Sequence, residues 1–209
     1  MSVVDRPALS RTRIAATALE LIDANGLGGL SMRKLGAELG VEAMSLYHYV
    51  TNKGDLFDAV LDQLYTEIDL PEVDDDDWES AIRLGLRSFH DVLMLHPAAL
   101  ELFAGRQAHS EQALHVLYWA HQRFQAVGLS FGDAHTALHF AVSFVMGHAA
   151  SELGTMSQLK TDTTTARAEI VDPNLVAFFA HGDEITGDEM FDTGLDVVVA
   201  GLRHRYELP

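Results

Sequence analysis

The 209-residue sequence contains no cysteine, which excludes disulfides, thiolate metal sites and cysteine nucleophiles. It also lacks any apolar run near the roughly 18 residues that a membrane-spanning helix needs. The first residues, SVVDRPALSRTR, contain no apolar core of the signal-peptide type. We therefore expect a soluble, cytoplasmic protein. The sequence has no phosphate loop, no Ser-His-Asp pattern and no paired carboxylates in a motif context, which argues against an enzyme.

Positive charge is also scarce, because 14 Lys and Arg face 31 Asp and Glu, giving a formal net charge of −17. The imbalance is uneven: residues 1–53 carry a net charge of +1, and the remaining 156 residues carry −18. A wholly acidic protein argues against nucleic acid. Salt, however, screens each charge within about 10 Å. The acidic body formed by residues 54–209 therefore does not neutralise the basic head formed by residues 1–53. We expect the body to repel DNA and orient the head toward it, with few phosphate contacts.

Residues 31–53, SMRKLGAELGVEAMSLYHYVTNK, are the most informative segment. The pattern predicts a helix capped by Ser31, a left-handed turn at Gly40, and a second helix that begins near Glu42 and buries Leu46. The other face of this second helix is made of small, hydroxyl and aromatic side chains: Ala43, Met44, Ser45, Tyr47, His48 and Tyr49. A solvated helix normally carries Lys and Glu there. The composition is typical of a helix that meets base edges and phosphates.

Helical periodicity continues through the rest of the chain, and no strand pattern competes with it. The predicted segments are helices at 10–25, 53–68, 78–95, 97–104, 114–127 and 131–154, a mobile loop at 155–172, and helices at 173–181 and 188–206. Asn52 is placed to cap the helix at 53–68, with Asp55 in a capping-box-like position. The segment LPEVDDDD at 70–77 marks a boundary. Its contiguous aspartates lack the alternate spacing of a calcium loop, so we interpret them as solvated.

The motif LGVxxxxLYxxVxNK at 39–53 resembles that of the TetR family of bacterial transcriptional regulators. Two further segments, GLSFGDAHTALHFAVSFVMG at 128–147 and FxxGLDVVVAGL at 191–202, are similar to the ligand-binding body of the tetracycline-repressor branch. The resemblance implies an all-α fold. It places a three-helix, helix-turn-helix DNA-binding domain at 1–53, a connecting helix at 53–69, and a larger helical ligand-binding and dimerisation domain at 70–209.

By this resemblance, residues 42–49 form the recognition helix and their exposed side chains face the major groove. It further implies that Ser31, Met32 and Arg33 contact the DNA backbone, that Arg33 also reaches a base, and that Lys53 binds a phosphate. The chemistry is suitable, since Arg can bind guanine through two hydrogen bonds and Met can lie against a thymine methyl. Two alternatives stay open: Tyr47 packs within the head, and Met44 is a partly buried structural residue.

A single helix-turn-helix reads few base pairs, so specific binding calls for a twofold dimer on a near-palindromic operator of double-stranded DNA. Glycine within a helix costs about 1 kcal/mol relative to alanine, so repeated glycines suggest the close approach of another helix. We expect a homodimer through an intermolecular four-helix bundle from 131–154 and 188–205. Its candidate interface residues are Gly147, Ser151, Gly154, Gly194, Val197, Val198 and Gly201. Packing of the same faces within one chain is the alternative.

The family resemblance also implies a cavity for a small-molecule effector. The candidate lining residues are Phe89, Leu93, Leu102, Phe103, Trp119, Phe140, Phe144 and His148, although aromatic residues at helical spacing can equally form a core. The tetracycline-repressor branch binds a magnesium-bound drug through histidines and a glutamate. The matching positions here are Phe103, Ser143 and Ser151, and Gly85 and Asp69 stand where polar drug contacts are expected. We therefore expect a largely apolar, metal-free effector.

Histidine is abundant, with 11 residues, and His135 and His139 lie one helical turn apart. No Glu or Asp completes a zincin-type motif, so we interpret this pair as exposed or capping and assign neither a metal site nor a cofactor. The prediction is a repressor that a ligand releases from DNA. The alternative is an activator, or a regulator controlled by a protein partner.

Overall fold

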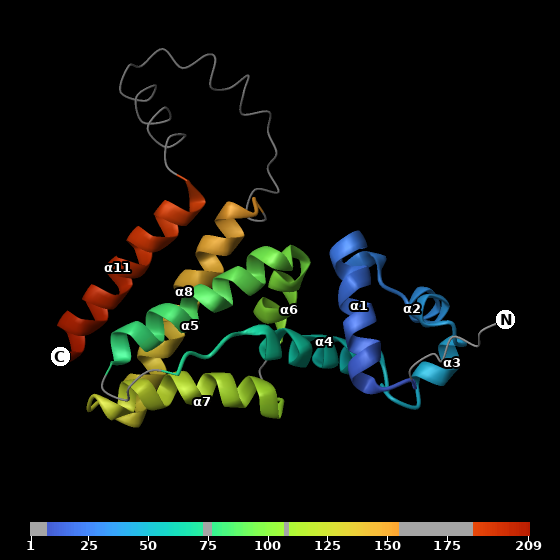
Figure 1. Ribbon diagram of the computed structural model, residues 1–209, viewed down its shortest axis with the longest axis horizontal. Coiled ribbons are helices and arrows are strands. Elements are labelled where there is room, and N and C mark those ends of the chain that lie inside the picture. Colours follow the sequence, from blue (N-terminus) through green and yellow to red (C-terminus); the bar gives the residue numbers. More distant parts are fainter. Residues whose placement is uncertain (1–7, 73–76, 107–108, 155–185) are drawn as a thin grey trace, which may run out of the picture. The chain divides into compact units, whose positions relative to one another are not determined.

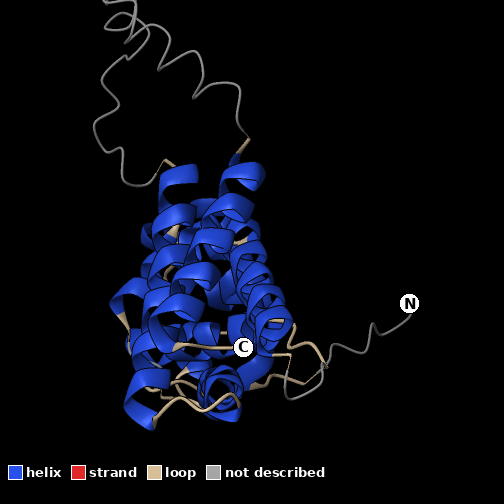
Figure 2. Ribbon diagram, turned by 90° about the vertical axis from the view of Figure 1, so that its left-hand side faces the viewer, coloured by secondary structure: helices blue, strands red, loops and turns tan. Residues whose placement is uncertain are grey.

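A computed structural model of the protein describes residues 8–72, 77–106, 109–154 and 186–209. Every regular element within these ranges is a helix (Figures 1 and 2), which confirms the predicted all-α fold. None of the described helices is long and apolar enough to span a bilayer. The loop predicted at 155–172 and the helix predicted at 173–181 lie outside the described residues.

The chain divides into two compact units, and the first combines residues 1–70 with residues 91–119. Its elements are α1 (Arg11–Asn25), η1 (Leu27–Gly29), α2 (Met32–Leu39), α3 (Ala43–Leu46), α4 (Lys53–Glu67), η2 (Pro97–Ala99) and α6 (Leu100–Gly105). Helix α1 packs against α2 and α4, and α2 packs against α3. Fully buried apolar side chains from α1 to α4, including Ile14, Ile22, Leu35, Leu46 and Leu56, form the core of this head.

Local signals set the ends of these helices where the sequence predicts them. Ser10, Ser31 and Asn52 each accept a hydrogen bond from the backbone N–H three residues on, which satisfies a donor that the helix leaves open. Gly40 follows α2 with φ of 70° and ψ of 33°, the left-handed conformation that glycine adopts without strain. Gly26 ends α1 at a positive φ as well.

The recognition helix is shorter than the predicted range of 42–49. Glu42 is its N-cap, but α3 proper covers only Ala43–Leu46. The next three residues, 47–49, continue in tight turns whose N–H groups bond to carbonyls three residues back. The backbone has to leave the α-helical path here, because Asn52 must be extended, at φ of −163°, to cap α4.

The second unit combines residues 71–90 with residues 120–209. It contains α8 (Phe131–Glu152), α11 (Gly187–Tyr206), residues 78–90 of α5 (Trp78–Leu95) and residues 120–126 of α7 (Glu111–Ala126). Asp77 caps α5, since its carboxylate accepts the Ser80 N–H at 3.1 Å. Trp78 is buried and packs against Phe124 with ring centroids 6.0 Å apart.

Helix α5 is joined to α11 by ion pairs within this second unit. Arg83 binds Glu79 on its own helix and Asp196 of α11, at 2.8 and 2.6 Å. Arg87 binds Asp188 and Asp192, both on α11. The predicted division of the chain into two domains at residue 70 remains a prediction.

Candidate nucleic-acid interface and ligand-binding body

The helix-turn-helix is closed by the near contact of α2 and α3 at Gly36. A Cβ at this buried position would lie 2.9 Å from the Val41 carbonyl oxygen and 3.1 Å from the Ala43 nitrogen. Any larger residue would push the two helices apart. The sequence analysis missed Gly36, although a glycine inside a helical pattern is a signal of such close approach.

The predicted DNA-contacting face is open to solvent. Met44 is 70% exposed, and Tyr47 and Tyr49 are 42% and 41% exposed. The other predicted contacts are exposed or half-buried: Ser31, Met32, Arg33, Ala43, Ser45, His48 and Lys53. This exposure excludes the partly buried role for Met44, whereas partial packing of Tyr47 in the head stays open.

Two lysines hold the loop that precedes α2. The Lys34 ammonium donates to the Gly29 carbonyl at 2.9 Å, and the Lys53 ammonium donates to the Leu30 carbonyl at 3.0 Å. The Lys53 nitrogen also lies 5.3 Å from the centroid of the Phe57 ring. An ammonium carries three donors, so Lys53 retains two of them for a phosphate oxygen.

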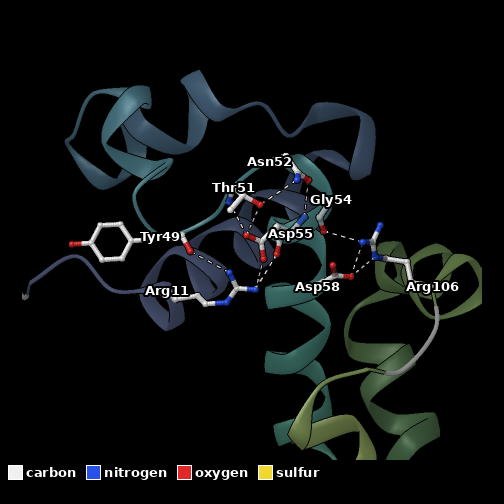
Figure 3. A network of polar contacts seen from close by, with 8 residues as sticks. All are labelled: Arg11, Tyr49, Thr51, Asn52, Gly54, Asp55, Asp58 and Arg106. Carbon is white, nitrogen blue, oxygen red and sulfur yellow. Dashed lines mark hydrogen bonds and ion pairs between the residues drawn. The ribbon is translucent and has the colours of Figure 1, made fainter.

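Behind the recognition helix, a polar network fixes the start of α4 (Figure 3). The Arg11 guanidinium lies 2.6 Å from the Asp55 carboxylate and donates to the Tyr49 carbonyl at 3.1 Å. The same carboxylate accepts the Thr51 N–H at 2.6 Å. Hydrogen bonds from Arg11 first, and then from the Thr51 backbone, lower the pKa of Asp55 to about 2.

The predicted capping box at this point is formed only in part. Asn52 accepts the Asp55 N–H at 3.0 Å, as expected. The returning bond to the Asp55 carboxylate comes from Thr51, one residue before the cap. A capping box takes this bond from the N-cap residue itself. The displaced bond ties Thr51 to α4 and so anchors the end of the recognition segment.

A second arginine connects the C-terminal end of α6 to the first two turns of α4 (Figure 3). Arg106 donates to the Asp58 carboxylate at 2.6 Å and to the Gly54 carbonyl at 3.0 Å. The hydrogen bond to Asp58 raises the pKa of the Arg106 guanidinium, so this link stays charged. Gly54 directly follows Lys53, the predicted phosphate contact. The sequence analysis singled out neither arginine for this network, because their partners lie about 40 to 50 residues away in the chain.

The eight predicted effector contacts are divided between the two units. Leu93, Leu102, Phe103 and Trp119 belong to the first unit, and Phe89, Phe140, Phe144 and His148 belong to the second. Seven of the eight are buried or half-buried. Phe140 is the exception at 59% exposed. The effector lining therefore remains a prediction.

Two shallow clefts occur within the first unit, with volumes of about 210 and 240 Å³. Arg11 and Asp62 line both of them, and polar groups such as Asp55 and Gln63 line one or the other. Neither cleft includes any of the eight predicted effector contacts.

The positions expected to bind a magnesium-bound drug do not fit that ligand. Phe103 packs edge-on against Tyr65, with ring centroids 5.2 Å apart. The Ser143 hydroxyl donates to the His139 carbonyl of its own helix at 2.8 Å, and Ser151 is exposed. None of the three offers the imidazole or carboxylate that the resemblance calls for.

The glycines of the predicted dimer interface differ in what surrounds them. A Cβ at Gly194 would collide with the Phe144 ring of the same chain, so this glycine serves packing within the protomer. Gly154 lies beyond the end of α8 at φ of 65°, so its backbone conformation explains it. Gly147 and Gly201 lie inside helices, and a Cβ at either position would have nothing within 4 Å, so intrachain packing does not explain them.

The valines of that interface differ as well. Val197 is 68% exposed, whereas Val198 is 6% exposed and packs inside its own chain. The assignment of Val198 to the interface is therefore wrong for this fold, because neighbouring residues on a helix point about 100° apart. Gly147, Ser151, Val197 and Gly201 remain exposed candidates.

The histidines sort into an exposed pair and a buried cluster. His135 and His139 are exposed, as interpreted from the sequence. Among the residues that the structure describes, one group of three side chains could hold a metal ion: His90, His148 and Glu152. The sequence analysis placed His148 in the effector cavity and missed this cluster, because His90 lies 58 residues before His148.

An exposed helix-turn-helix face on a three-helix head, followed by a helical body, defines a DNA-binding transcriptional regulator. Residues 14–60 match the family of bacterial regulatory proteins, tetR family, and residues 70–206 match the tetracyclin repressor-like C-terminal domain. The chain belongs to the TetR family of transcriptional regulators, whose members are not enzymes.

Similar proteins cover nearly the whole chain. The tetracycline repressor protein class A from transposon 1721 of Escherichia coli is 32% identical over 200 residues, which are 94% of this chain and 92% of that protein. An HTH-type transcriptional regulator of Saccharopolyspora erythraea is 29% identical, over 94% of this chain and 86% of that one. The crystal structure of the Streptomyces coelicolor TetR family protein ActR in complex with actinorhodin matches with a TM-score of 0.80 and 26% identity, covering 94% and 96% of the two chains.

Proposed function

We propose that the protein is a ligand-responsive transcriptional repressor of the cytoplasm that binds a near-palindromic operator as a homodimer. The observation that carries this proposal is the exposed face of α3 and the following turn, where Met44, Tyr47 and Tyr49 are 41% to 70% exposed. Exposed apolar and aromatic side chains on a surface helix are costly unless they meet a partner. A relative that is 32% identical is named a repressor, which supports this mode of action.

Dimerisation is supported by the outer faces of α8 and α11. Phe140 and Val197 are 59% and 68% exposed, and Gly147 and Gly201 present bare backbone on the same helices. Small residues between exposed apolar ones allow two helices to approach closely and bury both faces. A twofold axis through these helices would place two heads on one operator.

The effector is proposed to be small, largely apolar and free of bound metal. Phe103, Ser143 and Ser151 replace the drug-metal ligands that the tetracycline-repressor branch uses, so this chain cannot hold that drug in the same way. The related ActR was crystallised in complex with actinorhodin, which supports a body that accepts an organic molecule. Calorimetric titration of an apolar compound panel tests this part, and a panel without a binder would count against it.

Within the first unit, the Arg106 contacts link α6 to the start of α4. Arg106 at the end of α6 is bonded to both Gly54 and Asp58 in the first two turns of α4, next to Lys53. A shift of α6 would therefore move the start of α4 and the Lys53 ammonium. Such a displacement would change the spacing of the two heads on DNA, which is how an effector would release the repressor.

Two alanine variants test DNA binding, using duplex DNA selected from a random-sequence pool by the wild-type protein. Tyr47→Ala and Lys53→Ala should each weaken binding about 10- to 100-fold, as expected for losing a base or phosphate contact. Lys53→Ala should also lower the salt dependence by about one counterion per chain. Tyr118→Ala, at a tyrosine that is 59% exposed on α7, is the matched control and should bind normally. Unchanged affinity in both head variants would refute the assignment.

A further inference from the structure

The second unit contains a cluster of three metal-ligating side chains, of which only His148 belongs to the predicted effector lining. His90 lies on α5, and His148 and Glu152 lie one turn apart on α8. Their ligand atoms all lie within 4.8 Å of one another. We propose that His90, His148 and Glu152 form a binding site for a divalent transition-metal ion, with Zn²⁺ as the best-matched ion.

The distances within the cluster fit a metal better than they fit hydrogen bonds. The Nε2 atoms of His90 and His148 each lie 3.3 Å from the same oxygen, Oε2 of Glu152. Both distances exceed the range of about 2.7–3.2 Å that N–H···O hydrogen bonds occupy. Ligand atoms about 2.0–2.1 Å from a tetrahedral Zn²⁺ are separated by about 3.3–3.4 Å, which matches the spacing of the two histidine–carboxylate pairs. His148 Nε2 is buried and makes no hydrogen bond to any described residue.

The surrounding aromatic rings hold the two imidazoles in place. Phe191 of α11 stacks on His90 with centroids 4.1 Å apart and an interplanar angle of 28°. It also meets His148 edge-on at 5.3 Å, and Phe144 lies 6.0 Å from His148. Ligands whose rotamers are fixed by packing need no ordering when the ion binds. The Glu152 side chain is 29% exposed, so the ion can enter from its side.

The donor set favours a particular class of ion. Two imidazoles and one carboxylate suit Zn²⁺, Co²⁺ or Ni²⁺, whereas Mg²⁺ and Ca²⁺ prefer oxygen ligands. Three protein ligands leave a fourth tetrahedral position for water or another small donor. None of the site's three ligands is Phe103, Ser143 or Ser151, the positions that correspond to the drug-metal ligands of the tetracycline-repressor branch. The site would join α5 to α8 within one protomer.

The alternative is that Glu152 simply neutralises a protonated histidine. That arrangement would need no ion, and added metal would bind no better here than at other surface histidines. The exposed pair His135 and His139 provides a matched comparison, because it has the same spacing on the same helix but no third ligand. The inference does not depend on operator binding, so its test is independent of the proposed function.

The test is calorimetric titration of Zn²⁺ into the full-length protein, without a histidine tag and after removal of metal with a chelator. We expect one ion per chain, and four-coordinate visible bands when Co²⁺ is used instead. His148→Gln and Glu152→Gln should each weaken Zn²⁺ binding at least tenfold, since even residues that only support metal ligands contribute about 10- to 100-fold. The double variant His135→Gln, His139→Gln should bind like the wild type.

Glu152→Gln is not expected to misfold, because Gln has the same size as Glu and the side chain is partly exposed. Weaker Zn²⁺ binding by this variant would therefore reflect the loss of a ligand. Excess Zn²⁺ should raise the melting temperature of the wild type, and the same Zn²⁺ concentration should raise that of Glu152→Gln by less. The inference is overturned if no ion binds, if both cluster variants retain wild-type affinity, or if only the His135 and His139 variant loses binding.

Discussion

At the scale of single residues, Asp55 shows how a side chain next to the recognition segment is held in one charge state. Its carboxylate receives the Arg11 guanidinium and the Thr51 N–H, and the pKa falls to about 2. A carboxyl whose pKa is lowered by folding stabilises the native state above its unfolded pKa of about 3.9. This contribution is lost as the pH falls from about 4 to about 2.

The pKa of Asp55 can be measured by following its carboxyl ¹³C shift as the pH is lowered. We expect a midpoint of about 2 in the wild type. Arg11→Met should raise this midpoint toward the ordinary value of about 3.9, because it removes the largest cause of the shift. The remaining Thr51 bond should keep it below that value. A wild-type midpoint near 4 would show that the Arg11 contact is absent in solution.

At the scale of elements, His96 joins three segments of the first unit at the place where α5 ends. Its two ring nitrogens face Asp23 of α1 at 2.8 Å and Glu67 of α4 at 2.9 Å. Both ring nitrogens can donate only when the imidazole is protonated. His96 is 9% exposed, so water replaces these partners poorly when they are lost. The sequence indicated only that one helix ends at residue 95 and that the next begins at residue 97.

We predict that His96→Leu lowers the free energy of unfolding by about 1.5–3 kcal/mol, the range for hydrogen bonds to charged groups. The matched control is His115→Leu, at an exposed histidine of the same unit, which should change stability by less than about 0.5 kcal/mol. Urea denaturation of both variants measures the difference. Equal midpoints for the two would mean that the His96 bridges do not stabilise the fold.

The distance in the chain between interacting residues explains which features could be predicted from the sequence. Helix ends depend on neighbours three or four residues away, so Ser10, Ser31, Gly40 and Asn52 were readable from the sequence. Contacts between segments that are distant in the chain could not be predicted from the sequence. The His90 cluster, the hydrogen bonds of Arg106 and the burial of Val198 all depend on such contacts. The exposed face of the recognition segment was predictable because its composition departs from that of a solvated helix. The end of α3 at Leu46 could not be predicted from this segment, because the cap of α4 determines where α3 ends.

At the scale of the whole molecule, the proposed dimer is the step that makes two heads act together. Gly201 of α11 has open space around it in one protomer, so a large residue there does not disturb the chain itself. In a bundle of α8 and α11 from two protomers, the same residue would collide with the partner. The oligomeric state of a variant with a large residue at position 201 therefore shows whether α8 and α11 form the bundle between protomers.

We predict that the wild type sediments as a dimer at micromolar concentration and that Gly201→Phe sediments as a folded monomer. Gly105→Phe is the control, since this exposed glycine at the end of α6 also has nothing within 4 Å and lies outside 131–154 and 188–205. It should remain dimeric. A monomeric wild type, or a Gly201→Phe variant that stays dimeric, would rule out the bundle.

The central claim is that two exposed helix-turn-helix faces read one symmetric operator. The most direct test is selection of binding sites from a pool of random duplex DNA by the wild-type protein, followed by sequencing. We predict enriched sites with two inverted half-sites whose centres are about one helical turn, 10–10.5 base pairs, or a multiple of it apart. Tyr47→Ala should fail to enrich them. Enrichment of a single unpaired half-site, or no enrichment above the starting pool, would contradict the account.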